Sequence, residues 1–325
     1  MKTNLKVVTI GGGTGSFTVL SGLKKYPLDL TAIVTMADDG GSTGVLRDEL
    51  GVLPPGDVRQ CLVALSKSDL LMRELMNYRF TDGKLKGHNF GNLLLSALEK
   101  VTGSFDLAVE KASEILRISG HVIPATLDKV SLVARLKDGA IIHGQSLIHK
   151  TNLQQLDQME LIPSAQANPK AVAAIQAAKA IIIGPGDFYS SLIPNLLVKG
   201  IVDAIQHSSA KKIFVTNLMA KKGHTEGFSA DDFAQTIERY LGCKVDTVLY
   251  NTFVPSQNLL ERYARNGEVM IKRPKKKLDA RYVGADLVSR SFPKARAGDP
   301  LERTYIRHDP DRLANIIHEL LSPLI

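Results

Sequence analysis

The sequence has no tryptophan and few aromatic residues of any kind. Aromatics make up 6% of its 325 residues. Proteins that bind single-stranded nucleic acid by stacking bases on aromatic rings usually carry more. Apolar runs are short as well, and none approaches the roughly 18 residues of a membrane-spanning helix. We therefore expect neither a base-stacking nucleic-acid binder nor a membrane-spanning protein.

Cysteine is also scarce. Cys61 and Cys243 are the only two, and neither belongs to a Cys-x-x-Cys pair. A disulfide framework or a cysteine-rich zinc site is not expected, and a reducing compartment fits this composition. The first residues, MKTNLKVVTIGGG, lead into a strand without the apolar segment of a signal peptide. These features together predict a cytoplasmic protein.

The positive charge is unevenly distributed. The formal net charge is +8, and residues 271–296 carry nine Lys or Arg against two Asp. Within this stretch, KRPKKK (residues 272–277) resembles a basic patch, but Pro274 interrupts any helix there. Three interpretations remain open for this segment: a solvated loop, attraction of an anionic ligand and, last, contact with nucleic acid.

The order of apolar runs predicts an α/β fold. A β-rich run at residues 5–10 ends in three glycines, a helix-spaced segment follows, and a second apolar run covers residues 30–36. This βαβ opening implies a Rossmann-like, mostly parallel sheet with helices on both faces. We expect a single domain over residues 1–325. Two extended runs at residues 131–148, on either side of Asp138-Gly139, predict a hairpin within a β excursion at about 127–168.

The first glycine-rich segment follows the first strand and opens a helix. Free N–H groups and the dipole at a helix start suit a phosphate. The pattern is close to the dinucleotide fingerprint, although Ser16 replaces the third small residue, and a Lys-Ser/Thr pair typical of a P-loop is missing. The candidate ligand-binding residues here are Gly11, Gly12, Gly13, Thr14, Gly15 and Ser16.

Two adjacent carboxylates, Asp38 and Asp39, follow the second apolar run and precede two glycines. Like charges at a strand end persist if Mg²⁺, a ribose or a sugar faces them. We therefore predict Asp38 and Asp39 as ligand-binding residues and as a tentative Mg²⁺ site. A solvated Asp-Gly turn is the alternative. If the ligand were NAD, Asp38 would stand where the ribose-binding acid is expected.

Further polar residues follow other apolar segments and are candidate ligand contacts. Asp57 is either a helix N-cap or a ligand-binding acid, and Arg59 one turn later is a candidate phosphate contact. Asn217 ends a predicted strand, where its amide can bind a base or a sugar hydroxyl. The other candidates are His88, Asn89 and Asn92 in GHNFGN, and Gly184 and Gly186 in GPGDFYSS, a second anion-type loop.

The motifs in combination resemble a known family. They are GGGTGSF, AIVTMADDGGSTGVLR, PPGDVRQCLVALS, GHNFGNLLLSALE, IIIGPGDFYSSLIPNLLVKGI and IFVTNLM. The sequence resembles the gluconeogenesis factors, the regulator branch of the 2-phospho-L-lactate transferase superfamily. The resemblance implies a Rossmann-like dimer that binds UDP-N-acetylglucosamine. It also implies a role in growth on gluconeogenic carbon, cell shape and envelope synthesis, and it leaves room for an unidentified protein partner.

Two more candidate ligand residues come with the resemblance. Tyr263 in ERYARNG and Arg307 in IRHD resemble the family's ligand-binding tyrosine and arginine. Taken locally, Tyr263 is equally a helix-surface aromatic and Arg307 a surface charge. Two enzymatic functions stay open beside the regulator: an Mg²⁺-dependent transferase of the 2-phospho-L-lactate type, acting on a nucleotide diphosphate donor, and an NAD-binding oxidoreductase.

Overall fold

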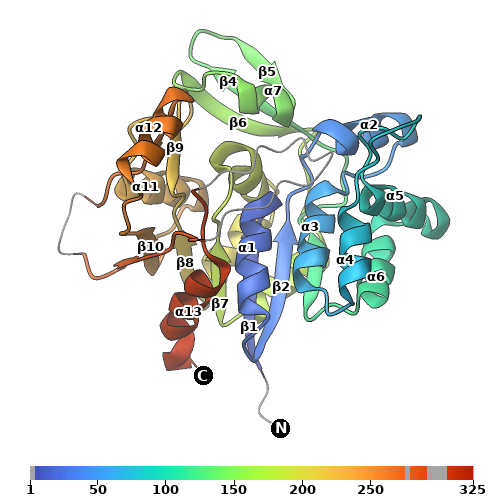
Figure 1. The fold of residues 1–325 in the computed structure, drawn as a ribbon, viewed down its shortest axis with the longest axis horizontal. Coiled ribbons are helices and arrows are strands. Elements are labelled where there is room, and N and C mark those ends of the chain that lie inside the picture. The colour runs from blue at the N-terminus through green and yellow to red at the C-terminus, as the bar shows by residue number, and fades with distance from the viewer. Residues whose placement is uncertain (1–3, 275–278, 291–305, 325) are drawn as a thin grey trace.

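A seven-stranded parallel sheet forms the centre of the molecule (Figure 1). The computed structural model describes residues 4–274, 279–290 and 306–324. Along the sheet the strand order is β12-β10-β8-β7-β1-β2-β3. The strands are β1 (Leu5–Gly11), β2 (Leu28–Val34), β3 (His121–Pro124), β7 (Ala180–Ile183), β8 (Lys211–Val215), β10 (Thr247–Asn251) and β12 (Tyr282–Ala285).

The sheet is buried on both faces, which explains its continuous apolar runs. Val8 and Ile10 of β1 belong to one core cluster, whereas Val7 belongs to the other. Alternate residues of a strand point to opposite faces, so one run of branched side chains fills both cores. The Rossmann-like parallel sheet predicted from the sequence is confirmed.

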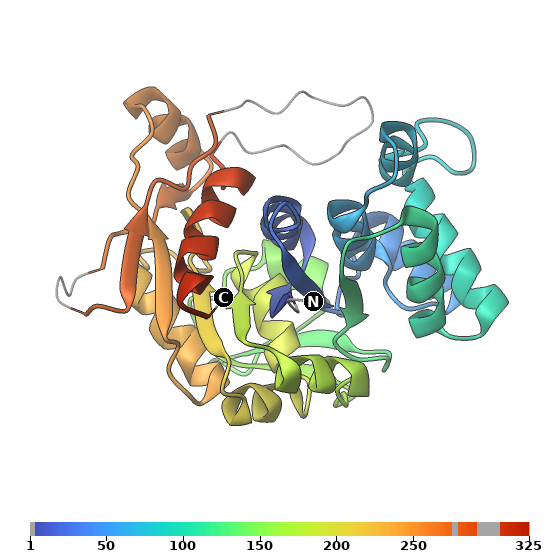
Figure 2. The ribbon, with the colours of Figure 1, turned by 90° about the horizontal axis from the view of Figure 1, so that it is seen from below.

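Helices cover both faces of the sheet, as Figure 2 shows from below. On one side α1 packs between α3 and α13, and on the other α8, α10 and α11 contribute to the second core. The helices are α1 (Gly13–Leu23), α2 (Gly41–Leu50), α3 (Gly56–Leu65), α4 (Leu70–Asn77), α5 (Phe90–Thr102), α6 (Phe105–Leu116), α7 (Gln145–Lys150), α8 (Pro169–Ala177), the π-helical turn η1 (Phe188–Leu192), α9 (Ile193–Leu196), α10 (Ile201–His207), α11 (Ala230–Leu241), α12 (Gln257–Arg265), α13 (Pro310–Leu321) and the 3₁₀ turn η2 (Ser322–Leu324).

The predicted β excursion is a three-stranded antiparallel sheet in the order β5-β4-β6, built from β4 (Ser131–Leu136), β5 (Ile141–His143) and β6 (Leu156–Ile162). It lies above the carboxyl ends of the central strands in Figure 1. The β4–β5 hairpin around Asp138-Gly139 is confirmed. The extended run predicted to reach Ile148 is wrong at its end, because Gly144 leaves the strand with φ 95° and α7 begins at Gln145.

Two short strands, β9 (Met219–Lys221) and β11 (Glu268–Met270), pair antiparallel beside the carboxyl end of β8. Among the helices within the described ranges, none combines the length and apolarity needed to cross a membrane. In the basic segment, Lys272 and Arg273 are exposed, whereas Lys275, Lys276 and Lys277 lie outside the described residues.

Candidate functional site

The strand order reverses between β1 and β7, because the chain adds strands on one side of β1 before it returns to the other. In open parallel sheets ligands bind outside the carboxyl ends of the strands at such a switch point. The segment Gly11–Ser16 follows β1 and the segment Gly184–Gly186 follows β7. We call them the first and the second glycine loop.

The two glycine loops touch each other. A Cβ atom added to Gly15 would stand 2.0 Å from the carbonyl oxygen of Pro185. A Cβ on Gly184 would stand 3.0 Å from the carbonyl oxygen of Val215, at the end of β8. Glycine at these positions therefore lets three neighbouring strand ends converge.

The first glycine loop opens α1, as the sequence predicts. Gly13 adopts φ 60°, a left-handed conformation that favours glycine. The backbone N–H of Gly13 donates a hydrogen bond to the carboxylate of Asp57. A Cβ on Gly12 would stand 2.2 Å from Oδ2 of the same carboxylate. Asp57 thus reaches the start of α1 from another helix.

This position of Asp57 corrects one prediction. Asp57 is not the N-cap of α3, because the helix begins at Gly56 and Pro55 precedes it without a side-chain cap. Instead, burial and the neighbouring charge of Asp38 raise the pKa of Asp57 to about 8. Arg59 attracts the ionised form, but this attraction is smaller than the burial penalty.

Asp38, which is partly buried, forms the second half of a carboxyl pair with Asp57. Burial raises its pKa, although the N–H of Gly40 donates to Oδ1 at 3.0 Å and Thr43 donates to the carboxylate. A Cβ on Gly56 would stand 2.7 Å from Oδ2 of Asp38, so the start of α3 lies directly against this acid. A cation or a hydrogen-bond donor placed here would favour the ionised forms of both carboxyl groups.

Asp39, the sequence neighbour of Asp38, faces elsewhere. Its Oδ2 accepts the N–H of Gln145 at 2.9 Å and its Oδ1 accepts the N–H of Ser146 at 2.7 Å. Both donors begin α7 of the excursion. The charge of Asp39 still raises the pKa of Asp38, and the charge of Asp38 raises that of Asp57, 19 positions along the chain. The Mg²⁺ role predicted for Asp39 stays a prediction.

Arg59, a candidate phosphate contact, is buried at 8% exposure and enters a side-chain network. Its Nε donates to Oδ1 of Asn92 at 3.0 Å, and its Nη1 donates to Oδ1 of Asn77 at 2.7 Å. The guanidinium therefore links α3 to α4 and α5. This geometry favours a role in positioning Asn92.

The GHN motif continues the same network towards α2. The side chain of Asn89 caps α5 by accepting the N–H of Asn92. The hydroxyl of Ser42 accepts the N–H of Asn89 at 3.2 Å and lies 3.3 Å from Nδ1 of His88. Because Oγ of Ser42 accepts the N–H of Asn89, its own proton is free to be donated to Nδ1 of His88. Ser42 is a site-region residue that the sequence analysis missed, although it lies inside the ADDGGSTG motif.

The second glycine loop carries its own acid, Asp187, which the sequence analysis also missed. Nδ1 of His149 lies 3.1 Å and Nζ of Lys221 3.9 Å from Oδ2 of Asp187. Burial alone would raise the pKa of Asp187, but His149 and Lys221 hold it well below the usual range. Asp187 also accepts the N–H of Ser190 at 3.1 Å.

His308 lies at the end of β8. It hydrogen-bonds to the carbonyl of Thr216, the residue before Asn217, and burial lowers the pKa of His308 to about 4. Arg307 directly precedes His308 in the chain. The N–H of Ile306 donates to the hydroxyl of Tyr263 at 2.9 Å.

Tyr263 is buried at 6% exposure, so its interpretation as a helix-surface aromatic is wrong. Its hydroxyl holds the segment that carries Arg307. The roles of Tyr263 and Arg307 in ligand binding stay predictions, and so do those of the other candidate residues.

Two side-chain oxygens directly after β8 are buried without a hydrogen-bond partner. They are Oγ1 of Thr216 and Oδ1 of Asn217. Buried polar atoms in native proteins are nearly always hydrogen-bonded, so orphaned ones need an explanation such as a ligand or water. The hydroxyl of Ser190, in the segment after the neighbouring strand β7, hydrogen-bonds to the carboxylate of Asp187.

The described residues contain no cluster of three or more His, Cys, Asp or Glu arranged to hold a metal. Mg²⁺ in phosphate-binding sites commonly uses one or two carboxylates, with waters and phosphate oxygens completing its octahedron. Asp38 and Asp57 fit that smaller donor set. As oxygen donors with raised pKa values, they would be favoured in the ionised form by a bound cation.

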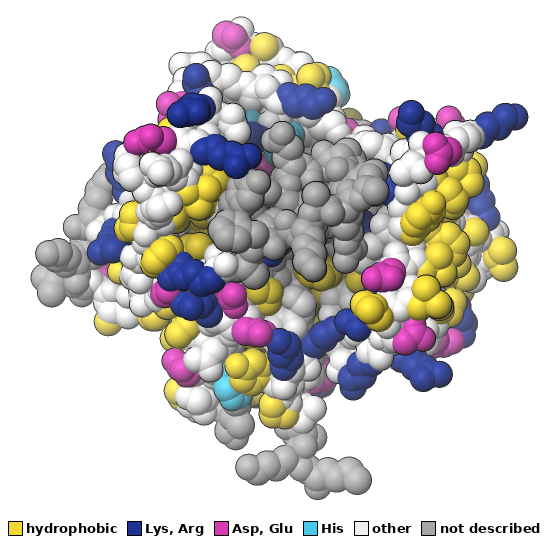
Figure 3. Space-filling model, viewed as in Figure 1, with side chains coloured by type: hydrophobic (Ala, Val, Ile, Leu, Met, Phe, Trp, Pro, Cys, Tyr) yellow, Lys and Arg dark blue, Asp and Glu magenta, His cyan; other side chains and the backbone are white. Residues whose placement is uncertain are grey.

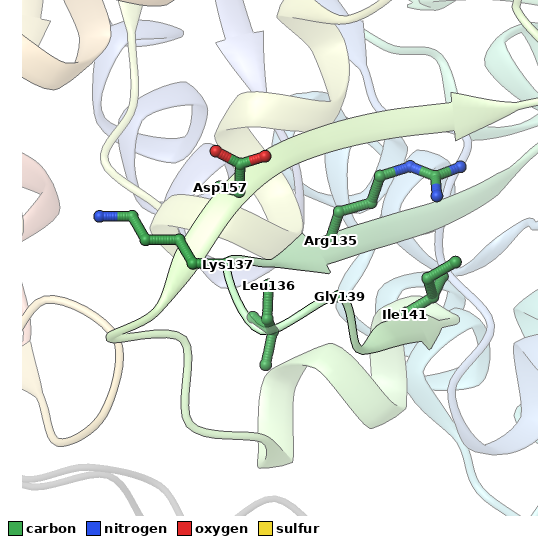
Figure 4. Close-up of a pocket in the computed structure, with 6 residues that line it drawn as sticks. All are labelled: Arg135, Leu136, Lys137, Gly139, Ile141 and Asp157. Carbon is green, nitrogen blue, oxygen red and sulfur yellow. The ribbon is translucent and has the colours of Figure 1, made fainter.

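A pocket of about 370 Å³ lies on the excursion, lined by Arg135, Leu136, Lys137, Gly139, Ile141 and Asp157 (Figure 4). Its charges are mixed, and Arg135 is already paired with Glu160 at 2.6 Å. None of the candidate residues predicted from the sequence lines it. The candidate site is therefore the switch point.

Comparisons with known proteins agree with this architecture. The sequence profile of the family described as 2-phospho-L-lactate transferase CofD matches residues 7–290. The chain belongs to this family. A putative gluconeogenesis factor of Thermotoga maritima is 42% identical over 318 residues, covering 97% of this chain and 99% of the relative. A gluconeogenesis factor of Listeria innocua is 38% identical over 328 residues, covering 98% and 97%.

A solved structure extends the likeness to three dimensions. A crystal structure from Bacillus halodurans, described as a UPF0052 family member, superposes with a TM-score of 0.88 at 36% identity. The match covers 97% of this chain and 99% of that one. The family resemblance predicted from the motifs is confirmed. The assignment gives the oxidoreductase alternative no support.

Proposed function

We propose that this member of the gluconeogenesis factor family is a cytoplasmic regulator that binds a nucleotide-sugar, UDP-N-acetylglucosamine, at the switch point. Its output would be control of carbon metabolism during growth on gluconeogenic carbon, and of cell shape and envelope synthesis. The relatives at 38–42% identity are named gluconeogenesis factors. The ligand identity rests on the family resemblance together with the chemistry of the site.

The observation that carries the proposal is the set of unsatisfied groups around one sheet edge. Oγ1 of Thr216 and Oδ1 of Asn217 lack partners, and Asp38 and Asp57 are carboxyl groups with raised pKa values. A nucleotide-sugar offers hydroxyl and amide donors for these oxygens and a diphosphate for the first glycine loop. Arg307 would bind the ligand from the end of β8, held by Tyr263.

The second candidate function is an Mg²⁺-dependent transferase of the 2-phospho-L-lactate type. The paired acids favour it, because a diphosphate beside the ionised carboxylates of Asp38 and Asp57 would be repelled unless a cation lay between them. Asp38 and Asp57 would hold Mg²⁺, which when bound would neutralise charge on a diphosphate leaving group. The first glycine loop would bind and orient the donor.

A thermal-shift panel separates the two functions. Purified protein is heated with UDP-N-acetylglucosamine, UDP-glucose, GDP, GTP or NAD, each with and without Mg²⁺. A ligand that binds only the native state stabilises it by about 2.7 kcal/mol at a hundredfold excess over Kd. We expect a UDP-sugar shift without Mg²⁺ that Arg307→Ala removes. Arg312→Ala is the matched control, because Arg312 lies on α13 and pairs with Asp286.

Other outcomes point to the transferase. A shift seen only with a guanine nucleotide and Mg²⁺ would contradict the regulator and call for an assay of phospholactate transfer. A shift with NAD alone would revive the oxidoreductase.

We also propose a homodimer, as expected from the family resemblance. Apolar side chains gather along the right-hand side of the face in Figure 3, where α4–α6 lie. Leu70 and Leu71 of α4 are 63% and 75% exposed. Light scattering on the wild type and on Leu71→Glu tests whether this surface takes part. An unchanged dimer in the variant would place the interface elsewhere.

A further inference from the structure

The short helix α7 is tied at both ends to loops of the central sheet. At its start, Asp39 accepts the N–H groups of Gln145 and Ser146 at 2.9 and 2.7 Å. At its other end, Nδ1 of His149 lies 3.1 Å from Oδ2 of Asp187. Asp39 follows β2, and Asp187 belongs to the segment after β7.

β1 lies between β2 and β7 in the sheet. Because α7 contacts the loops that follow β2 and β7, it passes over the carboxyl end of β1, which lies between them. That end is where the first glycine loop begins. In Figure 1 the excursion that contains α7 lies above this edge of the sheet.

Further contacts hold the last turn of α7 and the chain that follows it. Nζ of Lys221 donates to the carbonyl oxygen of His149 at 2.5 Å, and Nε2 of His224 lies 2.9 Å from the carbonyl oxygen of Thr151. Ile148 is fully buried in the core that includes the excursion strands. A helix of only six residues is not stable alone in water, so its position depends on these contacts.

We propose that α7 is a bridge that fixes the spacing between the Asp39 loop and the second glycine loop, with Asp39 and His149 as its positioning residues. The proposal rests on the proposed function, because the two joined segments flank the candidate ligand site. In this arrangement Asp39 acts through α7 and contacts neither ligand nor metal. Loss of the contacts at either end of α7 should therefore loosen both the Asp39 loop and the second glycine loop.

The first test is a double-mutant cycle on ligand affinity. Calorimetry with UDP-N-acetylglucosamine compares the wild type, Asp39→Ala, His149→Ala and the double variant. Each single change should raise Kd about five- to tenfold, the usual size of a lost helix cap. The double variant should show the same increase in Kd as either single variant, because both residues act through α7 and the loss of one contact already removes its effect. Multiplied effects in the double variant would overturn the bridge.

Two controls separate positioning from loss of folding. Asp138→Ala removes a similar bond, the one from the N–H of Ala140 at 3.0 Å, in the same excursion but away from the switch point. It should leave Kd unchanged. Asp39→Asn keeps an acceptor oxygen and should restore most of the affinity lost in Asp39→Ala. A Kd in Asp138→Ala as high as in Asp39→Ala would contradict the proposal.

The second test needs no ligand. Amide hydrogen exchange in Asp39→Ala should rise at Gln145 and Ser146 and also at Ser190, whose N–H is held by Asp187 at the far end of the bridge. Faster exchange confined to Gln145 and Ser146 would overturn the bridge. If the wild type fails to bind any UDP-sugar, the proposed ligand is wrong, whereas the exchange result still decides the bridge.

Discussion

The two glycine loops at the switch point look alike in sequence and differ in electrostatics. Each follows a parallel strand, and each has a carboxylate close by. At the first loop, burial raises the pKa values of Asp38 and Asp57; the charge of Asp39 further raises that of Asp38, and the charge of Asp38 further raises that of Asp57. At the second loop, His149 and Lys221 hold the pKa of Asp187 low.

This difference shows at which loop the carboxylates lack a compensating charge from the protein. The negative charge of Asp187 is already balanced by His149 and Lys221, so we assign Asp187 a structural role. The carboxylates of Asp38 and Asp57 are costly to ionise until a cation or a hydrogen-bond donor arrives. Carboxylates with perturbed pKa values at a strand end are typical of functional sites, because a bound ligand can supply the positive charge or hydrogen-bond donor that the fold does not provide.

The largest expected effect comes from Asp57→Asn. Its raised pKa means that ionisation costs stability as pH rises above the ordinary value of 3.8, and the full cost is present above about 8. The free energy of unfolding of the variant should therefore exceed that of the wild type by about 1–3 kcal/mol at pH 9 and should be about the same at pH 4. Urea unfolding at both pH values measures this.

Ligand binding should move in the opposite direction in the same variant. Loss of a charged acceptor should weaken UDP-sugar binding by about ten- to a hundredfold. A variant that is less stable than the wild type at pH 9 would make Asp57 a structural acid like Asp187.

The next effect tests the contact between the loops. Gly15→Ala would place a Cβ 2.0 Å from the carbonyl oxygen of Pro185, so backbone must move. We expect a loss of about 1–3 kcal/mol in the free energy of unfolding. Gly186→Ala is the matched control, because its Cβ would meet only the flexible side chain of Leu192 at 3.1 Å. Equal losses would show that the loops are not tightly packed.

A smaller effect is expected from Asp187→Asn, which removes the compensated charge. Because the folded pKa is depressed, the stabilisation is present above about pH 4 and is lost as pH falls below that value. The variant should lose about 0.5–1.5 kcal/mol at pH 7. The gap to the wild type should close in acid, as followed by urea unfolding from pH 7 down to pH 3. A gap that widens in acid would contradict the pairing.

The smallest change in stability is expected for Ser190→Ala. Its Oγ is buried beside the carboxylate of Asp187, on which His149 and Lys221 act more strongly, so its removal should change stability by less than about 0.5 kcal/mol. UDP-sugar affinity should still fall about fivefold, as one lost hydrogen bond would cause. Thermal shift and calorimetry on the same sample measure both. An unchanged affinity would remove Ser190 from the ligand site.

Local pattern carried much of the prediction. The apolar run of β1, the glycines after it and the helix-spaced residues of α1 lie within 19 consecutive residues, so their backbone conformations could be predicted from neighbours alone. The parallel sheet followed from that unit. The convergence of GGGTGS, ADDGGSTG, GPGDFYSS and TNLM on one edge then followed from strand direction.

Partners between side chains could not be predicted in this way. Asp38 is followed directly by Asp39, yet the two side chains have different partners. Asp38 lies against the start of α3 and acts on Asp57. Asp39 accepts the first N–H groups of α7, a helix within residues that the sequence predicts as extended. Arg59, a candidate phosphate contact, hydrogen-bonds to Asn92 and Asn77, two partners that its local sequence does not indicate. Tyr263 lies on a helix with mostly polar neighbours, and only the chain folding back at Ile306 buries it.

The strands, the glycine turns and the sheet edge at which they meet follow from the local sequence, because hydrophobic period and backbone freedom act over a few residues. Which of the acids are compensated depends on the tertiary structure. Burial and charge pairing depend on segments that approach from distant parts of the chain, as His149 does at Asp187 and Asp57 does at Gly13.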